Sequence, residues 1–402
     1  MNRLFRLIWG ADFDPEIRPL LVVGFFETLA GSSVWSFAGI WAIKRLGASQ
    51  TELAVTFLFG AIGAIAAGWA GGHLSDHLGR RPVILGSAGA FAAAPLGMLA
   101  AGRHVPAGLA VLAALGLFGA SFNAATSALV ADLLPVERRT DGYAAFRVAN
   151  NLGVCFGPVA GGALLTGTAW GRLFLGAFVL GVVSIVVAAR VLPRRGAFAP
   201  EAPPDRSSLQ VVWQDHAFLV FVAAMVLASM TYLAYEQLLP ISLTTAHGLA
   251  PSTWGFLVII NPVLVVVGQL RITRLAAHVS PSARLAVAMP LMGLPFVFLQ
   301  VADGIAVIVV MIVVFVVGEM LWVPTSQTVA IAFAPPDLRG AYMGVYGSAS
   351  QAAFALTPFA GLQIRAAFGD AAMWRAVACV SIVAALAGAA VARGRRVASL
   401  PA

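Results

Sequence analysis

Charged side chains are scarce in this chain, and their scarcity decides its class. Asp, Glu, Lys and Arg make up 10% of the 402 residues, whereas a soluble domain carries about 25%. Apolar residues make up 60%, and the mean hydropathy is +0.90. We therefore expect an integral membrane protein. In such a protein the net charge of +8 reports membrane topology, so it does not indicate nucleic-acid binding.

Cysteine and lysine are almost missing as well. The two cysteines, Cys155 and Cys379, both fall within apolar runs, so neither a disulfide framework nor a metal cluster is expected. Lys44 is the only lysine, and we interpret this preference for arginine as the mark of a GC-rich bacterial genome. The sequence has no Gly-rich loop ending in Lys-Ser or Lys-Thr, so ATP use is not indicated. No cofactor is expected.

Long apolar runs fill most of the chain, and each can cross a hydrocarbon core of about 30 Å as a helix. A polar stretch rich in Arg and Pro separates six runs from six. The sequence therefore predicts an all-α membrane protein with twelve transmembrane helices, in an N-terminal half (1–192), a linker (193–215) and a C-terminal half (216–402). The runs lie at 19–42, 52–71, 82–102, 107–131, 141–167, 172–192, 217–246, 252–276, 283–302, 304–333, 340–367 and 371–392.

The basic residues are unevenly divided between the two sides of this map. With the N-terminus inside, eighteen of them lie at one face and six at the other, while Arg147 lies within a run. Because Arg and Lys favour cytoplasmic loops, both termini and the linker are predicted to be cytoplasmic. The stretch from Met1 to Arg18 has no apolar core, so it is not predicted to be a cleavable signal.

An internal repeat relates the two halves. One constant shift of 200 residues aligns Pro and Gly positions at several helix ends, and the pairs are Pro135 with Pro335, Arg139 with Arg339, Gly68 with Gly268, Pro158 with Pro358, and Gly161 with Gly361. Halves repeated in the same sense are typical of transporters that bind substrate between them, near the bilayer midplane.

A short polar turn, GHLSDHLGRRP at residues 72–82, separates the second run from the third. It resembles the G-x-L-x-D-x-x-G-R-R/K motif between helices 2 and 3 of the major facilitator superfamily. The matching residues are Gly72, Leu74, Asp76, Gly79, Arg80 and Arg81, and His77 stands where the family usually has a basic residue. Two arginines alone would fit a generic positive loop, but the spacing of the glycines and the aspartate favours the motif.

A second motif, GVCFGPVAGG at residues 153–162, lies in the fifth run. It resembles the G-x-x-x-G-P-x-x-G-G pattern in helix 5 of proton-driven exporters, with matches at Gly153, Gly157, Pro158, Gly161 and Gly162. Small residues let helices approach closely, so ordinary helix packing is the alternative interpretation. Uptake carriers that resemble sugar porters usually have Pro-Glu-Ser or Pro-Glu-Thr after helix 6, where this chain reads LPRR. The resemblance therefore implies export.

Four ionisable residues lie within apolar runs, where a charge is costly and a functional role is the default expectation. They are Glu27, Arg147, Glu236 and Glu319. Glu27 and Arg147 differ in depth by only a few Å. An ion pair between them is therefore allowed, and it would either brace the N-terminal half or take part in a proton switch. Glu236 and Glu319 have no basic residue in their own runs, and a carboxylate buried alone can exchange protons near neutral pH.

The stretch around Glu319, GEMLWVPTSQT at residues 318–328, resembles helix 10 of multidrug exporters of the LmrP type. The matching glutamate of that family is linked to proton coupling. The resemblance therefore implies a proton-coupling role for Glu319 first, with Glu236 and Glu27 as further candidates.

The resemblance also implies a latch on the cytoplasmic side. Asp132 ends the fourth run, at the face that holds the polar turn. In the family, this region and the turn form a charge network that closes the two halves. We therefore expect Arg80 to reach Asp132, and Asp76 to lie near the positive N-terminal end of the eleventh run. A solvated carboxylate at a helix end is the alternative for Asp132.

Aromatic and amide side chains within the runs form the predicted wall of a substrate cavity. Such a lining suits amphiphilic or cationic organic molecules, although aromatic residues of membrane proteins also face lipid. The candidates are Trp35, Phe37, Asn123, Asn150, Asn151, Tyr232, Tyr235, Asn261, Trp322, Gln327 and Gln351.

On these motifs and the repeat, the chain is identified as a member of the major facilitator superfamily, most similar to drug/proton antiporters of the LmrP and MdtH type. The resemblance implies a monomeric carrier, not an enzyme, in a bacterial cytoplasmic (inner) membrane. It implies export of a hydrophobic or cationic small molecule in exchange for protons, by alternating access. A proton-coupled symporter or a facilitator of one metabolite is the main alternative. The latch motif and the repeat disfavour a channel or a receptor.

Overall fold

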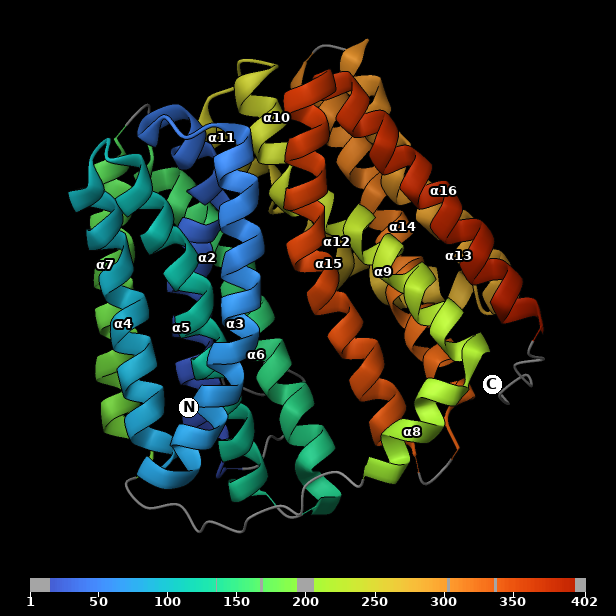
Figure 1. Cartoon of the computed structure of the whole chain (residues 1–402), viewed down its shortest axis with the longest axis horizontal. Coiled ribbons are helices and arrows are strands. Elements are labelled where there is room, and N and C mark those ends of the chain that lie inside the picture. The colour runs from blue at the N-terminus through green and yellow to red at the C-terminus, as the bar shows by residue number, and fades with distance from the viewer. Residues whose placement is uncertain are drawn as a thin grey trace. The chain divides into compact units, whose positions relative to one another are not determined.

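The computed structural model describes residues 15–134, 136–166, 169–193, 206–301, 304–335 and 338–394 (Figure 1). All regular structure within these ranges is helical. The apolar runs explain this, because a segment inside a bilayer must pair its own N–H and C=O groups, and a helix does so without a partner. The all-α class predicted from the sequence is confirmed for the described residues.

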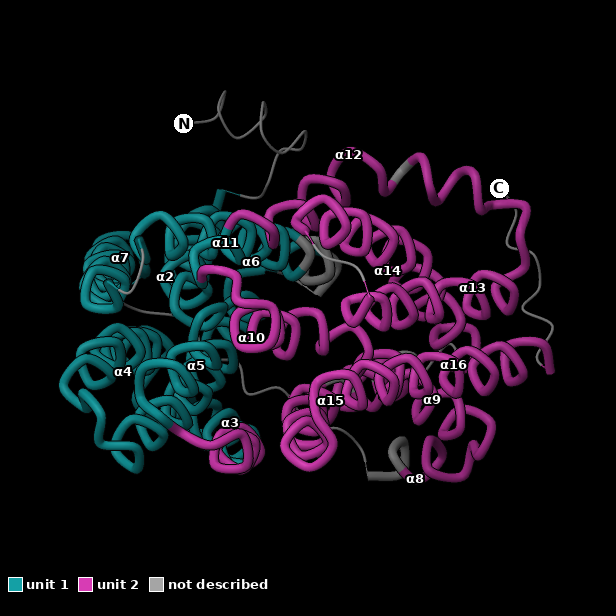
Figure 2. Tube along the Cα trace, turned by 90° about the horizontal axis from the view of Figure 1, so that it is seen from above, with its two compact units in different colours: residues 1–47, 59–201, 251–255 teal, residues 48–58, 202–250, 256–402 magenta. Residues whose placement is uncertain are grey.

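The chain divides into two compact units (Figure 2). Unit 1 consists of residues 1–47, 59–201 and 251–255, and unit 2 consists of residues 48–58, 202–250 and 256–402. Most of the predicted N-terminal half is therefore in unit 1 and most of the C-terminal half is in unit 2. Of the predicted linker, residues 194–205 lie outside the described residues.

Unit 1 is built on the central helix α2, which packs against α6 and α7, while α4 packs against α5 and α7. Its core joins side chains from these helices, including Leu20, Ile84, Phe122 and Ala149. The helices are α2 (Arg18–Trp41), continued by the π-helical turn η1 (Ala42–Leu46), α3 (Gln50–Leu78), whose residues 50–58 belong to unit 2, α4 (Arg80–Ala101), α5 (Val105–Leu133), α6 (Val136–Leu164) and α7 (Trp170–Val191).

Glycines set the distance between α2 and α6. A Cβ atom built at Gly153 would lie 2.7 Å from the Phe25 carbonyl oxygen, and one at Gly157 would lie 2.8 Å from that of Leu29. One turn further on, a Cβ at Gly161 would lie 2.7 Å from the Phe37 ring. Residues four apart share one helix face, so this face of α6 rests directly on α2.

In unit 2, α9 packs against α15 and α16, and α13 packs against α14 and α16. Prolines interrupt two of its long segments, because proline cannot donate the helical N–H bond. Pro240 follows the break between α9 and α10, and Pro295 opens the 3₁₀-helix after α13. The helices are α8 (Arg206–Gln214), α9 (His216–Gln237), α10 (Leu239–Thr245), α12 (Ile260–Leu275), α13 (Pro281–Gly293), η2 (Pro295–Gln300), α14 (Ile305–Phe333), α15 (Arg339–Phe368) and α16 (Asp370–Gly394). The short helix α11 (Pro251–Leu257) is divided, because its residues 251–255 belong to unit 1.

Ten helical segments of the described residues are long and apolar enough to cross a membrane. The predicted runs at 141–167 and 340–367 are helical too, as α6 and α15, but neither is among these ten. Both are interrupted by small and polar residues, such as Asn150 and Asn151 in α6 and Gln351 in α15. The count of twelve transmembrane helices and the cytoplasmic position of both termini stay predictions.

Candidate functional site

The polar turn of unit 1 is held together by one arginine. The side chain of Arg80, at the start of α4, is only 10% exposed. Its Nε donates to Asp132 Oδ2 at 2.7 Å, and its Nη1 donates to Ser75 Oγ at 2.8 Å and to Asp76 Oδ1. The predicted contact between Arg80 and Asp132 is confirmed. It ties the junction of α3 and α4 to the end of α5.

The glycines of this turn differ in what they do. Gly79 has a φ of +97° and precedes the first residue of α4. Only glycine adopts this conformation without strain, so the sharp reversal between α3 and α4 requires it. A Cβ at Gly72 would meet no atom within 4 Å, whereas one at Gly71 would lie 2.8 Å from Ser121 Cα. The close approach of α3 to α5 therefore depends on Gly71, which the motif does not include.

Arg81 and Asp76, the other two charged residues of the turn, lie in different environments. Arg81 Nη2 donates to the carbonyl oxygen of Ala189, near the end of α7. The side chain of Asp76 is 60% exposed, so its bond to Arg80 is screened by solvent and weak. The expected position of Asp76 near the start of the eleventh predicted run stays a prediction.

Arg147 is not the buried partner of Glu27 that the sequence predicted. Arg147 is exposed, and Glu27, which is 7% exposed, instead accepts a hydrogen bond of 3.0 Å from Ser184 Oγ. The reason is rotation about the α6 axis. Phe146 and Asn150 face Gly24 of α2, and each residue turns a helix by about 100°, so Arg147 points to another side.

Unit 2 brings together the other two intramembrane carboxylates. Glu236 Oε1 accepts a hydrogen bond from the Tyr232 hydroxyl at 3.0 Å, and Glu319 Oε2 accepts one from Asn261 Nδ2. The two carboxylates are within electrostatic reach of each other and of the hydroxyls of Tyr232 and Tyr235. No arginine or lysine among the described residues pairs with either of them.

Aromatic rings surround this carboxylate pair. The Tyr232 ring lies 6.0 Å from that of Trp322 and 5.9 Å from that of Phe315, centroid to centroid. The ring of Tyr235, which is 1% exposed, stacks on Phe315 at 4.4 Å. The indole Nε1 of Trp322 is buried and has no hydrogen-bond partner. The predicted residues Tyr232, Tyr235, Asn261 and Trp322 therefore gather around Glu236 and Glu319.

The remaining predicted wall residues are dispersed. Phe37 is fully buried against Gly161 in the packing of α2 on α6, and its assignment to a cavity wall stays a prediction. Asn150 keeps a buried Oδ1 without a hydrogen-bond partner, and Gln327 is partly buried. Trp35 is partly buried, and three further amides are exposed: Asn123, Asn151 and Gln351.

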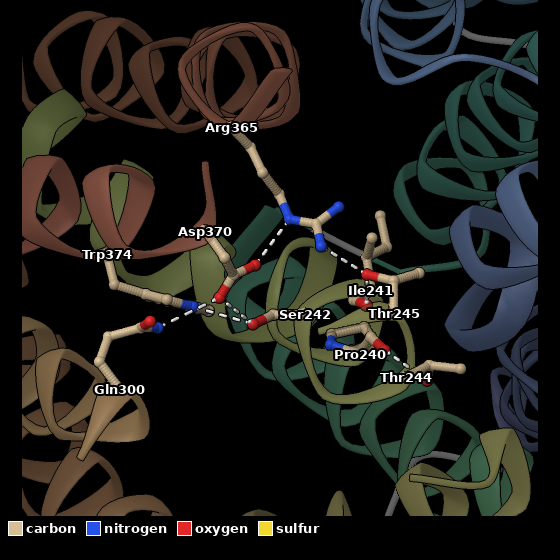
Figure 3. A network of polar contacts seen from close by, with 9 residues as sticks. All are labelled: Pro240, Ile241, Ser242, Thr244, Thr245, Gln300, Arg365, Asp370 and Trp374. Carbon is tan, nitrogen blue, oxygen red and sulfur yellow. Dashed lines mark hydrogen bonds and ion pairs between the residues drawn. The ribbon is translucent and has the colours of Figure 1, made fainter. Parts of the chain in front are cut away.

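Sequence reasoning missed a polar network that joins α10, α15 and α16 (Figure 3). Arg365 Nε donates to Asp370 Oδ1 at 2.6 Å, and both side chains are nearly buried, at 8% and 11% exposure. Ser242 Oγ donates to Asp370 Oδ2 at 2.7 Å and accepts from Trp374 Nε1 at 3.0 Å. Arg365 also donates to Thr245. Asp370 directly follows the helix end at Gly369, and this short Arg-to-Asp spacing was the one available signal.

A hollow of about 640 Å³ opens between α13 and α14, and neither Glu236 nor Glu319 lines it. Its lining is entirely apolar, so it offers no group that binds a proton. The lining residues are Ala286, Val287, Pro290, Leu291, Leu294, Pro295, Phe298, Val307, Val310, Met311 and Val314. We therefore place the candidate site at the carboxylate pair.

Comparison with known proteins assigns the family. The model of the Major Facilitator Superfamily matches residues 20–358. The multidrug efflux pump Tap of Mycolicibacterium fortuitum is 26% identical over 385 residues, which cover 88% of this chain and 90% of Tap. The multidrug resistance protein MdtH of Shigella boydii serotype 4 (strain Sb227) is 26% identical over 329 residues, covering 81% of this chain and 78% of MdtH.

A crystal structure of the nucleoside transporter NupG has the same fold, with a TM-score of 0.75 at 13% identity over 93% of this chain and 98% of that one. At this identity the similarity shows the fold alone and gives no information about the substrate. The family model, by contrast, spans most of the chain. The chain therefore belongs to the Major Facilitator Superfamily, whose members are membrane carriers and not enzymes.

Proposed function

We propose that this carrier exports hydrophobic or cationic small molecules in exchange for protons, by alternating access. The observation that carries the proposal is the pair Glu236 and Glu319, set among aromatic rings and without a basic partner in the described part of the chain. The names of Tap and MdtH, an efflux pump and a resistance protein, support the same activity.

The driving proton needs a group that changes charge during the cycle. Arginine stays protonated at all physiological pH values. The six histidines lie at or beyond helix ends, as His73 and His77 do at the end of α3. Carboxylates set away from water and cations remain, because such surroundings disfavour the ionised form. Two carboxylates within electrostatic reach of each other also disfavour double ionisation.

The same pair suits a positively charged substrate. A cation that enters between Glu236 and Glu319 replaces the proton as their counter-charge. The faces of Tyr232 and Trp322 add cation–π attraction, which contributes about 0.5–2 kcal/mol for each ring. Binding of substrate and binding of proton then compete, and this competition is the requirement for exchange. We further propose that the carrier works as a monomer in the bacterial inner membrane.

The test uses the purified protein in proteoliposomes with an acidic lumen and ethidium, a lipophilic cation, as the probe. Protons leaving the lumen should drive ethidium into it. Glu319→Gln keeps the size of the side chain and mimics its protonated form. We expect this variant to equilibrate ethidium but not to concentrate it, and Glu236→Gln to show a weaker form of the same defect. Glu52→Gln, at the exposed start of α3, is the matched control.

Two outcomes would overturn the proposal. If Glu319→Gln concentrates ethidium at the wild-type rate, the coupling residue has been misassigned. If wild-type protein concentrates the probe only when the lumen is alkaline, protons and substrate move together, and the carrier is the symporter that the sequence left as the alternative.

A further inference from the structure

One carboxylate of unit 1, like the pair in unit 2, is buried and has no basic partner among the described residues. Glu27 lies on α2, 7% exposed, and Ser184 of α7 is fully buried beside it. Ser184 Oγ donates to Glu27 Oε2 at 3.0 Å, while Glu27 Oε1 is buried and has no hydrogen-bond partner. A buried acceptor without a partner costs about 1–3 kcal/mol, and more when it is charged.

Ser184 behaves unlike the other buried serines of unit 1. A serine inside a helix commonly donates to a carbonyl one turn earlier. Ser33 Oγ donates in this way to the Ala30 carbonyl at 2.7 Å, and Ser87 Oγ to the Val83 carbonyl at 2.6 Å. The hydrogen bond of Ser184 instead crosses from α7 to α2. Its hydroxyl is therefore directed at one oxygen of Glu27.

No cation balances Glu27 among the described residues. The helices that pack against α2 are α4, α5, α6 and α7, with the turn η1. Among the residues of these helices whose side chains the structure describes, the charged groups are bonded elsewhere or exposed, and none is bonded to Glu27; they are Lys44, Arg45, Arg80, Arg81, Asp132, Arg138, Arg147, Arg172 and Arg190. The ionised form of Glu27 would therefore be a buried charge without a counter-charge, which is unfavourable.

We infer that Glu27 is a proton-binding site of unit 1 and that Ser184 is its positioning residue. Ser184 occupies Oε2, so the proton binds Oε1, the oxygen without a partner. Proton binding converts the carboxylate to a neutral acid, and the Ser184 bond keeps the rotamer of Glu27 in both states. The carrier then holds proton-binding carboxylates in both units. The inference rests on the proposed function in that protons are taken as the driving ion.

The test is infrared difference spectroscopy between acidic and alkaline buffer, on the full chain in lipid vesicles without substrate. Glu236→Gln and Glu319→Gln are present throughout, so neither of these carboxyls contributes to the carbonyl stretch of protonated buried carboxyls. We expect one titrating band, which Glu27→Gln removes. Ser184→Ala should move its midpoint to higher pH by about one unit, a tenfold change in proton affinity, because the ionised form loses a donor. Ser184→Thr keeps the hydroxyl and should restore the midpoint.

Ser33→Ala is the matched control, since it removes an equally buried hydroxyl that bonds only within α2; its midpoint should equal that of the parent. A band that survives Glu27→Gln would overturn the proton site. A midpoint that Ser184→Ala leaves in place would overturn the positioning role, and it is measurable even if Glu27→Gln fails to fold. Failure of pH-driven ethidium export with the Glu27 band intact would instead remove the proposed function alone.

Discussion

The network of Figure 3 predicts how firmly α10 is held in unit 2. Asp370→Asn removes the charge that Arg365 faces and weakens the bond from Ser242. Both members of the ion pair are about nine-tenths buried, at 8% and 11% exposure, and removing one partner of a buried pair costs about 3–5 kcal/mol. We expect the lower end of this range, because Arg365 keeps its bond to Thr245.

Hydrogen exchange of the α10 amides measures this cost directly. Ser242 and Thr245 are the α10 residues that the network holds, so its loss should favour local opening of this helix. At 1.4 kcal/mol for each factor of ten, about 3 kcal/mol corresponds to a roughly hundredfold faster exchange. The amides of α13, which contributes no residue to the network, serve as the internal reference.

Two further variants make the test decisive. Gln300→Ala removes only a 3.4 Å contact to Asp370 at an exposed position, so exchange should change less than about threefold. Replacing both partners, as Arg365→Met with Asp370→Leu, leaves no buried charge and should restore most of the protection. Exchange in Asp370→Asn within a factor of two of wild type would refute the reasoning, as would a double variant that opens as readily as the single one.

Three other predictions follow from unit 1 and the linker. Asp132→Asn should destabilise the protein by about 2–4 kcal/mol in a denaturant titration, because Arg80 loses the more buried of its two carboxylate partners; Asp76→Asn, at 60% exposure, should cost less than about 1 kcal/mol, and equal costs would contradict the assignment. Gly157→Ala should lower the thermal midpoint by forcing α6 away from Leu29, whereas Gly72→Ala should not lower it, and the reverse order would be the contrary result. Single cysteines within residues 193–215 should be labelled by an impermeant thiol reagent only in inside-out vesicles; labelling in intact cells would reverse the predicted topology.

Much of the architecture could be predicted from the sequence, because each membrane helix is a continuous apolar run along the chain. The apolar runs located the helices, and the polar turn identified the contact between Arg80 and Asp132. Side-chain direction was harder to infer. Glu27 and Arg147 lie at similar depths, yet Arg147 is turned from the face that Phe146 and Asn150 present to α2. Depth along a helix does not specify rotation about its axis, so the predicted ion pair was wrong.

The missed residues share a second cause. Ser184 is one of many small polar residues in apolar runs, and its role depends on which residue of α2 faces it. Arg365 was considered only as a charge that sets membrane topology, because its partners, Asp370 and Thr245, come from two separate helices. Contacts of this kind depend on helix packing, which a single sequence without homologues does not specify. The carboxylate pair in unit 2 was predicted residue by residue, whereas its closeness to Tyr232 and Trp322 required the structure.

The central claim is that the carrier exchanges its substrate for protons. Proton movement that is driven by a substrate gradient tests this claim directly. Proteoliposomes loaded with ethidium, with no pH gradient and with the membrane potential clamped, are diluted into probe-free buffer while a trapped indicator reports the pH of the lumen. Antiport predicts that the lumen acidifies as ethidium leaves, and that Glu319→Gln abolishes this acidification while ethidium still leaks out. A lumen that turns alkaline, or one whose pH stays constant during carrier-dependent efflux, would contradict the account.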